Sequence, residues 1–196
     1  MNRERFQKQL AFILGADKEK NILRQTQISG HVIRENDAEH AWHMAMMVYL
    51  LREYANEEFD LAKAMMALVR DVVEIDAGDT YAYDTKALEK QKERKEKAAD
   101  KIFGMLPDDQ RDELRTLFEK FEAGETHEAR FAKVMDNFQP LILNDSNGGA
   151  DWREHQVTKS KVVGRQQTSR FGSENIWKHT EELINANVER GNIIDE

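Results

Sequence analysis

Apolar residues recur at a helical spacing along nearly the whole of this 196-residue chain, and only two prolines and ten glycines interrupt the pattern. Alternation of apolar and polar residues, which is typical of half-buried strands, is scarce. The chain is long enough to bury a core, and no stretch rich in Pro, Gly or Ser divides it. We therefore predict an all-α fold, a compact multi-helix bundle that forms a single domain over residues 1–196.

The composition narrows the classes of function open to the chain. Hydrophobic residues make up 40% and charged residues 34%, and no apolar run reaches the roughly 18 residues that a membrane-spanning helix needs. The N-terminal residues lack the apolar stretch of a signal peptide. We expect a cytoplasmic protein with no membrane partner. The net charge of -8 argues against binding to a nucleic-acid polymer, although one local arginine can still bind a small nucleotide.

The clearest predicted helix spans residues 36–51. Asn36 can cap it, Glu39 lies three residues later, and the run that follows is apolar on nearly every face. These features are typical of a buried central helix. A second predicted helix spans residues 61–75, and Asp71 falls within its apolar stripe. A carboxylate in that position requires a partner.

Further helices are predicted by the same criteria. The Lys- and Glu-rich stretch 86–101 favours a solvated helix face, to which we assign no chemistry. Pro107 opens a helix that Gly124 ends, and the next helix, over 131–142, is expected to kink or end at Pro140. The prediction is completed by a loop at 144–149 and by two final helices, at 158–170 and at 173–190.

Three side chains on separate predicted helices could hold a divalent ion together. They are His40, Asp71 and Asp136, and because the chain has no cysteine, any metal must be held by His, Asp and Glu. Each has a plainer interpretation on its own. His40 could be a histidine at a helix start, Asp71 a paired core carboxylate, and Asp136 a surface residue near a kink. Only their combination favours a metal site.

Three segments of the chain resemble a known family. The segments Arg34–His40, Asp71–Asp79 and Ala132–Leu141 are similar, in this order, to those of the HD-domain metal-dependent phosphohydrolases, and within them to the small branch that contains bacterial 5'-deoxynucleotidases. The resemblance covers most of the chain. It implies an all-α HD-type fold, nucleoside 5'-monophosphates as substrates, nucleoside and inorganic phosphate as products, and, by analogy only, a homodimer.

The resemblance also implies the metal ligands. His40 matches the first metal histidine of the family, Asp71 the aspartate of its His-Asp pair, and Asp136 its distal aspartate. Imidazole and carboxylate ligands suit a divalent ion such as Mn, Co, Ni, Fe, Zn or Mg. Such an ion would polarise a phosphoryl oxygen and lower the pKa of a bound water.

Catalytic and substrate-binding residues follow from the same resemblance. Glu74 matches the acidic residue that helps to activate the attacking water, and Asp79 matches an aspartate that positions water or the sugar. Arg24 resembles the upstream arginine that binds phosphate, although the residues after it depart from the family pattern.

Arg70 departs from the family at the second metal histidine. A guanidinium has no lone pair to offer a metal and does not deprotonate in proteins. At about 4 Å and an effective dielectric constant of about 20, it would repel a divalent ion by roughly 8 kcal/mol. Metal affinity should therefore collapse unless Arg70 swings away.

Three explanations of Arg70 remain open from the sequence. Arg70 could be an introduced or accidental change of histidine, which one base substitution permits. The protein could instead have lost its metal, so that Arg70 neutralises Asp71 and Asp136 and the site serves as a phosphate sensor or inert nucleotide binder. Finally, Arg70 could rotate to pair with Glu74, leaving a weakened three-ligand metal site. The predicted function is a metal-dependent phosphohydrolase impaired by Arg70, and the alternative is an inactive nucleotide-binding or dimerisation module.

Overall fold

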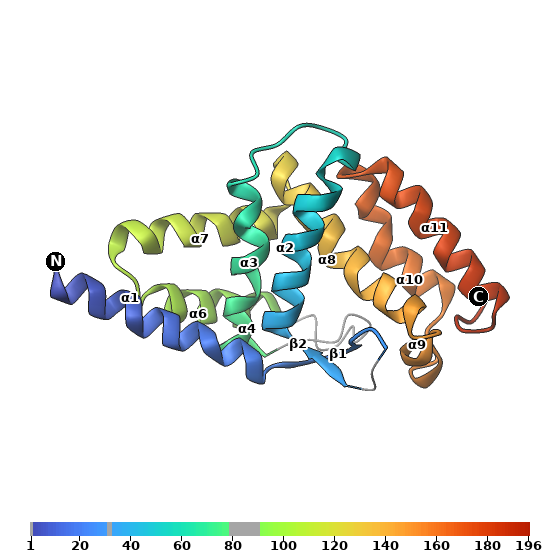
Figure 1. The fold of residues 1–196 in the computed structure, drawn as a ribbon, viewed down its shortest axis with the longest axis horizontal. Coiled ribbons are helices and arrows are strands. Elements are labelled where there is room, and N and C mark those ends of the chain that lie inside the picture. The colour runs from blue at the N-terminus through green and yellow to red at the C-terminus, as the bar shows by residue number, and fades with distance from the viewer. Residues whose placement is uncertain (1, 31–32, 79–90) are drawn as a thin grey trace.

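Helix α8 (His127–Ser146) lies at the centre of the computed structural model, which describes residues 2–30, 33–78 and 91–196. Four other long or well-packed helices lie against it (Figure 1): α2 (Asp37–Leu51), α7 (Asp108–Ala123), α10 (Lys159–Gln166) and α11 (Glu174–Glu189). The predicted all-α class is confirmed.

The remaining elements are mostly short. In chain order they are α1 (Arg3–Ala16), η1 (Asp17–Asn21), β1 (Leu23–Gln27), β2 (Arg34–Asn36), η2 (Arg52–Tyr54), η3 (Lys63–Met65), α3 (Met66–Val69), η4 (Arg70–Val73), α4 (Glu74–Ala77), α6 (Gln91–Phe103), α9 (Ala150–Glu154) and η5 (Gln167–Phe171), where η denotes a 3₁₀ helix.

One antiparallel hairpin, β1–β2, was not predicted. Buried and more exposed residues alternate along its strands, but apolar and polar residues do not. The buried positions are occupied by polar side chains, those of Arg24, Thr26 and Glu35. A hydrophobic pattern of period two therefore never appears in the sequence. The hairpin matters for the site, since β2 ends directly at the start of α2.

Helix α2 begins where the sequence predicts. The Asn36 side chain accepts a hydrogen bond from the Glu39 backbone N–H at 3.0 Å, and the Glu39 carboxylate accepts one from the Asn36 N–H at 3.0 Å. This capping box satisfies two N–H groups that would otherwise lack partners. It fixes the first turn of α2, which carries the buried His40.

The predicted continuous helix over 61–75 is wrong in its regularity. The segment divides into η3, α3, η4 and α4, and the helix tightens to 3₁₀ geometry at Arg70–Val73. Valines at 69, 72 and 73 restrict their χ1 angles in a helix, and short 3₁₀ turns are common where a helix is interrupted. All four residues of η4 are buried.

Pro140 does not end α8, contrary to one of the two expected outcomes. The helix continues to Ser146, so only residues 147–149 of the predicted loop at 144–149 lie outside a helix. A proline inside a helix costs about 3 kcal/mol. Leu141 and Leu143 beyond it are buried, and their packing offsets that cost.

The apolar core has two parts that meet at η4. The first surrounds α8 and includes Met44, Met66 and Phe131. The second lies between η4, α6 and α7 and includes Val73 and Phe118. Because η4 contributes to the second part and α3 to the first, the segment that carries Arg70 and Asp71 lies at the junction of the two.

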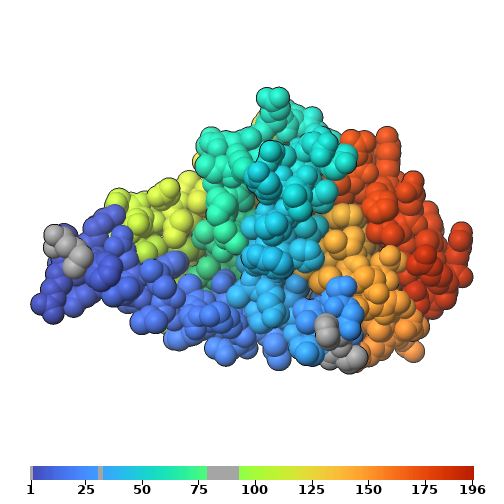
Figure 2. All heavy atoms as spheres, viewed as in Figure 1, coloured from blue at the N-terminus to red at the C-terminus, as the bar shows by residue number. Residues whose placement is uncertain are grey.

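The space-filling view shows how the segments of the chain are arranged on one face of the molecule. In Figure 2, α2 and the segments that follow it cross the middle of this face, with α1 and α7 on one side and the C-terminal helices on the other. Within the described residues, no helix has the length and apolarity required to cross a membrane.

Two glycine-to-alanine substitutions should have opposite effects on stability. A Cβ at Gly172 would lie 2.6 Å from the Arg130 carbonyl oxygen and 2.7 Å from Val134 Cγ2, so Gly172→Ala should lower the free energy of unfolding by about 1–3 kcal/mol. A Cβ at Gly164, inside α10, meets nothing within 4 Å, so Gly164→Ala should raise it by up to about 1 kcal/mol. Urea denaturation of both variants tests this, and equal effects would contradict the packing described.

Candidate functional site

Three predicted metal-binding side chains converge at the junction of the two cores. His40 comes from the first turn of α2, Asp71 from η4 and Asp136 from the middle of α8. The Nε2 atom of His40 lies 3.2 Å from Asp136 Oδ1 and 4.0 Å from Asp71 Oδ2. His40 and Asp71 are fully buried, and the side chain of Asp136 is 14% exposed. The site therefore reaches solvent on the Asp136 side.

The guanidinium of Arg70 lies between the two carboxylates. Its Nη2 atom is 2.8 Å from Asp71 Oδ1, and its Nη1 atom donates a short hydrogen bond to Asp136 Oδ1. Nη1 also lies 3.5 Å from His40 Nε2, and the guanidinium carbon lies 5.1 Å from the centre of the Phe121 ring. Arg70 is thus held by two negative charges and one aromatic face.

Charges in this cluster shift one another's pKa values. Burial disfavours the charge on Arg70, but the carboxylates of Asp136 and Asp71 outweigh that effect and raise its pKa. Burial would raise the pKa of Asp136, yet Arg70 and His40 hold it well below its usual range. Burial and Arg24 act to lower the pKa of His40, but hydrogen bonds to carboxylates raise it. Asp136 and Arg70 are therefore charged together at neutral pH.

The geometry bears on the third explanation of Arg70, in which it pairs with Glu74. Arg70 neutralises Asp71 and Asp136, and within the described chain no ion pair joins it to Glu74. Glu74 is instead paired with Lys95, whose Nζ atom lies 3.1 Å from Glu74 Oε1. The rotated Arg70 with an intact three-ligand site is not the arrangement found.

A divalent metal does not fit the chain as written. The donors suit one, since Asp71 is buried and neither of its oxygens has an aligned hydrogen-bond donor in the described residues. However, the guanidinium lies where a fourth ligand and the ion would have to be, and it cannot coordinate. Across residues 2–30, 33–78 and 91–196, no group of three or more His, Asp and Glu side chains has metal-binding geometry.

The far side of His40 is held by two residues that the sequence did not single out. His40 Nδ1 lies 3.0 Å from Gln139 Oε1 and 3.4 Å from Glu35 Oε2. The Gln139 amide donates to Glu35 and also lies 3.2 Å from His43 Nδ1. Gln139 lies one helical turn beyond Asp136 on α8, and this spacing was the available signal. Such outer partners fix the orientation and tautomer of a metal-binding imidazole.

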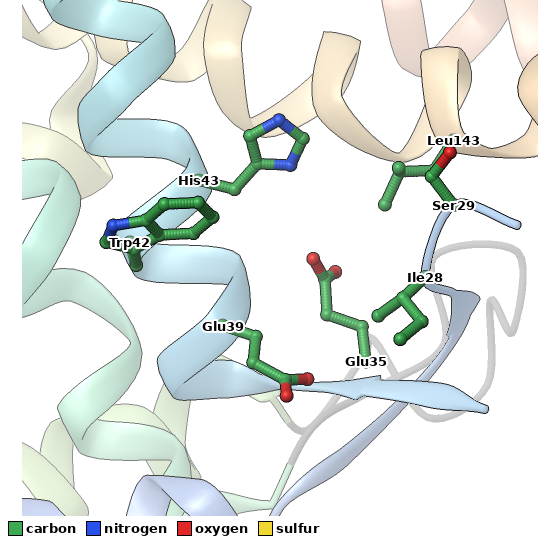
Figure 3. Close-up of a pocket in the computed structure, with 7 residues that line it drawn as sticks. All are labelled: Ile28, Ser29, Glu35, Glu39, Trp42, His43 and Leu143. Atoms are coloured by element: carbon green, nitrogen blue, oxygen red, sulfur yellow. The ribbon is translucent and has the colours of Figure 1, made fainter. Parts of the chain in front are cut away.

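Glu35 and His43 also line a small pocket beside α2. Figure 3 shows the Glu35 carboxylate directed into this space, with His43 and Trp42 on the α2 side. His43 is half-buried. Trp42 is 64% exposed. The indole lies 6.0 Å from the His43 ring, centre to centre.

Glu74, the predicted water-activating residue, is buried and supported by a lysine. Burial raises the pKa of Glu74, and Lys95 opposes this shift. Lys95 lies on α6, within the charged stretch to which the sequence analysis assigned no chemistry, and it is 9% exposed. Its neighbours at 93, 94, 96 and 97 are exposed, so this described part of the stretch is a solvated face from which Lys95 is turned inward, while residues 86–90 lie outside the described residues.

Two further predicted residues lie apart from this cluster or outside the description. Arg24 is buried, with its Nη1 atom 3.1 Å from Asp37 Oδ1 and its Nε atom 3.6 Å from Glu35 Oε2. These contacts hold it on the Glu35 side of His40, and its role in phosphate binding stays a prediction. Asp79 lies outside the described residues.

Comparison with known proteins identifies the family. The HD domain model matches residues 16–177. The chain belongs to the HD domain family. A crystal structure of a predicted metal-dependent phosphohydrolase from Magnetospirillum magnetotacticum MS-1 is 41% identical, covers 97% of this chain and 96% of that one, and superposes with a TM-score of 0.92. The multi-helix fold around α2, η4 and α8 is therefore an HD fold.

Curated relatives match over a shorter part of the chain. The 5'-deoxynucleotidase HDDC2 of Mus musculus is 31% identical over 108 residues, which is 55% of this chain and 53% of that protein. The human and Xenopus laevis proteins of the same name are 30% and 33% identical, over 55% of this chain and 52% and 53% of theirs. The chain thus spans about half the length of the curated relatives it matches.

Removal of the Arg70 charge should destabilise the fold strongly. Arg70→Met leaves Asp71 and Asp136 buried without a counter-charge, and we expect the free energy of unfolding to fall by about 3–5 kcal/mol. Arg190→Met is the matched control, because Arg190 is 59% exposed where it pairs with Asp145, and it should cost less than about 1 kcal/mol. Urea denaturation measures both, and similar losses would refute the central role of Arg70.

Stability should also fall with rising pH because of Glu19. Burial, followed by the charges of Asp71 and Asp37, raises the pKa of Glu19 from 4.5 to about 8. Between these two values the folded chain binds a proton that the unfolded chain has released, so stability declines as pH rises through this window. Glu19→Gln should gain stability relative to the unaltered chain between about pH 5 and about pH 8. The exposed Glu53→Gln is the control, and a difference that stays constant with pH for Glu19→Gln would contradict the assignment.

Proposed function

We propose that this chain is a phosphohydrolase of small phosphate esters, with nucleoside 5'-monophosphates as its substrate class and with activity limited by Arg70. The observation that carries the proposal is the convergence of His40, Asp71 and Asp136 around a single positive charge. Family membership and the name 5'-deoxynucleotidase borne by relatives support the reaction class and the substrate class.

The residues around the cluster have separate tasks in this proposal. Glu74 is the proton acceptor, and Lys95 holds its carboxylate in place from α6. Gln139 and Glu35 orient His40 from its Nδ1 side. Arg70 supplies a fixed positive charge where the family has a metal ligand, and for this reason we assign no metal-dependent step to the chain as written.

Arg70→His tests the proposed function directly. A neutral imidazole offers a lone pair where the guanidinium offers only donors. The purified chain should contain no stoichiometric divalent metal, whereas Arg70→His should bind about one divalent ion per chain and release phosphate from deoxynucleoside 5'-monophosphates at least about 100-fold faster. Metal analysis and phosphate release measure the two effects independently.

The ligand assignment has its own control in the Arg70→His background. Adding Asp136→Ala or Asp71→Ala should abolish the metal content, because each removes one carboxylate from the cluster. Asp145→Ala lies on the same helix away from the cluster and should leave it unchanged. Undiminished metal in the first two variants would show that the ligands are assigned wrongly. An Arg70→His protein with neither metal nor activity would refute the proposed function.

The second function that an observation favours is a non-catalytic phosphate or nucleotide binder. Arg70 already balances both acids, so the site is internally neutralised without an added ion. Such a protein would bind nucleoside monophosphates as written and would stay inactive after Arg70→His. Metal uptake with phosphate release in that variant excludes it.

A further inference from the structure

A second cavity, of about 480 Å³, opens one helical turn away from the acidic cluster. It lies where α7 ends, α8 passes and η5 folds back, and its walls are formed by Ala123, Gly124, Arg130, Lys133, Thr168 and Phe171. Among these described residues there are two cations, one hydroxyl and one aromatic ring, and none is acidic. Such a lining suits an anion that carries an apolar or planar group.

Arg130 supplies the first positive charge of the cavity. It is half-buried, and no carboxylate of the described chain lies within ion-pair distance of it. Several other arginines in this acidic protein are paired with carboxylates, as Arg115 is with three. A guanidinium that lines a cavity without an anionic partner is a ready binding group for a phosphate.

Lys133 supplies the second charge and is held in a defined position. Its ammonium donates to the Glu122 carbonyl oxygen at 2.8 Å and lies 5.7 Å from the centre of the Phe121 ring. The lysine crosses over Gly124, where a Cβ would lie 3.0 Å from its Nζ atom. Gly124 adopts a left-handed conformation with φ of 67°, so glycine at this position both ends α7 and leaves room for the lysine.

The cavity lies close to the acidic cluster, because Lys133 is near Asp136 on α8 and shares one aromatic contact with Arg70. Lys133 precedes Asp136 by three residues on α8, which separates them by about 4.5 Å along the helix axis. Lys133 and Arg70 both lie over the ring of Phe121, at 5.7 Å and 5.1 Å. A phosphate beside Lys133 would therefore lie about one helical turn from Asp136.

Phe171 supplies a flat apolar surface at the rim. It is 57% exposed, and the guanidinium of Arg170 lies 5.0 Å from its ring centre. An exposed phenylalanine beside cations is a platform on which a nucleobase can stack, and stacking of this kind contributes to binding for any base. The hydroxyl of Thr168, nearby in the wall, can donate to or accept from a sugar.

We propose that this cavity is the nucleotide-binding site of the chain, with Arg130 and Lys133 holding the phosphate of a nucleoside monophosphate and Phe171 stacking on its base. The proposal rests on the proposed function for its substrate class, and it assigns the residues that select that class. It differs from the sequence-based assignment of phosphate binding to Arg24, which is buried on the other side of His40.

Calorimetric titration of the chain as written with deoxyadenosine 5'-monophosphate, without added metal, tests the site. We expect saturable binding that Arg130→Gln and Lys133→Met each weaken by about tenfold or more, since each removes a charged hydrogen bond. Arg52→Gln is the matched control. Arg52 lies over an aromatic ring, as Lys133 does, and like Arg130 it has no carboxylate partner in the described chain. This variant should bind the nucleotide as tightly as the unaltered chain does. No saturable binding, or equal binding by the Arg130 variant, overturns the proposal.

A second titration separates nucleotide binding from phosphate binding. Phe171→Leu should weaken binding of the nucleotide by about tenfold and leave binding of 2-deoxyribose 5-phosphate unchanged. If both ligands bind to Phe171→Leu as they do to the chain, the stacking assignment is wrong. Within the described residues the Arg130 side chain makes no hydrogen bond or ion pair, and urea denaturation of Arg130→Gln shows whether the variant used in the first titration is folded.

Failure of this inference can be told apart from failure of the proposed function. If Arg70→His is inactive while the chain still binds nucleotide through Arg130, the reaction is wrong and the site stands. If Arg70→His releases phosphate and the further change Arg130→Gln leaves its KM unchanged, the reaction stands and the site is wrong.

Discussion

The guanidinium of Arg70 between two carboxylates is the interaction on which the centre of this protein depends. Asp71 and Asp136 come from distant parts of the chain, and two buried acids at such close range would repel each other without a cation between them. Arg70 provides that cation from the residue beside Asp71, held also by the ring of Phe121. The three helical segments α2, η4 and α8 can therefore meet around charged groups without an added ion.

The rest of the fold is arranged around the same meeting point. The two parts of the apolar core join at η4, and the cluster of His40, Arg70, Asp71 and Asp136 lies at this junction. Outside the first contacts, Gln139 and Glu35 hold His40 from behind, while Lys95 holds Glu74. His40 and Glu74 therefore each have polar or charged partners, which buried ionisable groups require.

Local sequence patterns predicted much of the fold and part of the candidate site. The capping box at Asn36, the apolar stripes and the helix end at Gly124 are encoded by neighbouring residues, and they predicted the helical class and the helix boundaries near them. The convergence of His40 with Asp136 was inferred only from their joint pattern. Partners chosen by tertiary packing had no local signal, because Lys95 looks like any other residue of a solvated stretch until α6 docks beside Glu74. The 3₁₀ break at η4 had only a weak local signal, in the valines at 69, 72 and 73.

A positive charge that belongs to the polypeptide has one further consequence. A bound ion can dissociate, exchange with another ion or be removed by a chelator, and its occupancy follows its free concentration. The guanidinium of Arg70 is covalently part of η4, so it enters the site when the chain folds and moves out of it only when this part of the chain unfolds. The resting state at the centre of this HD domain is therefore set by the folding equilibrium of a single chain, independently of which inorganic cations its surroundings contain.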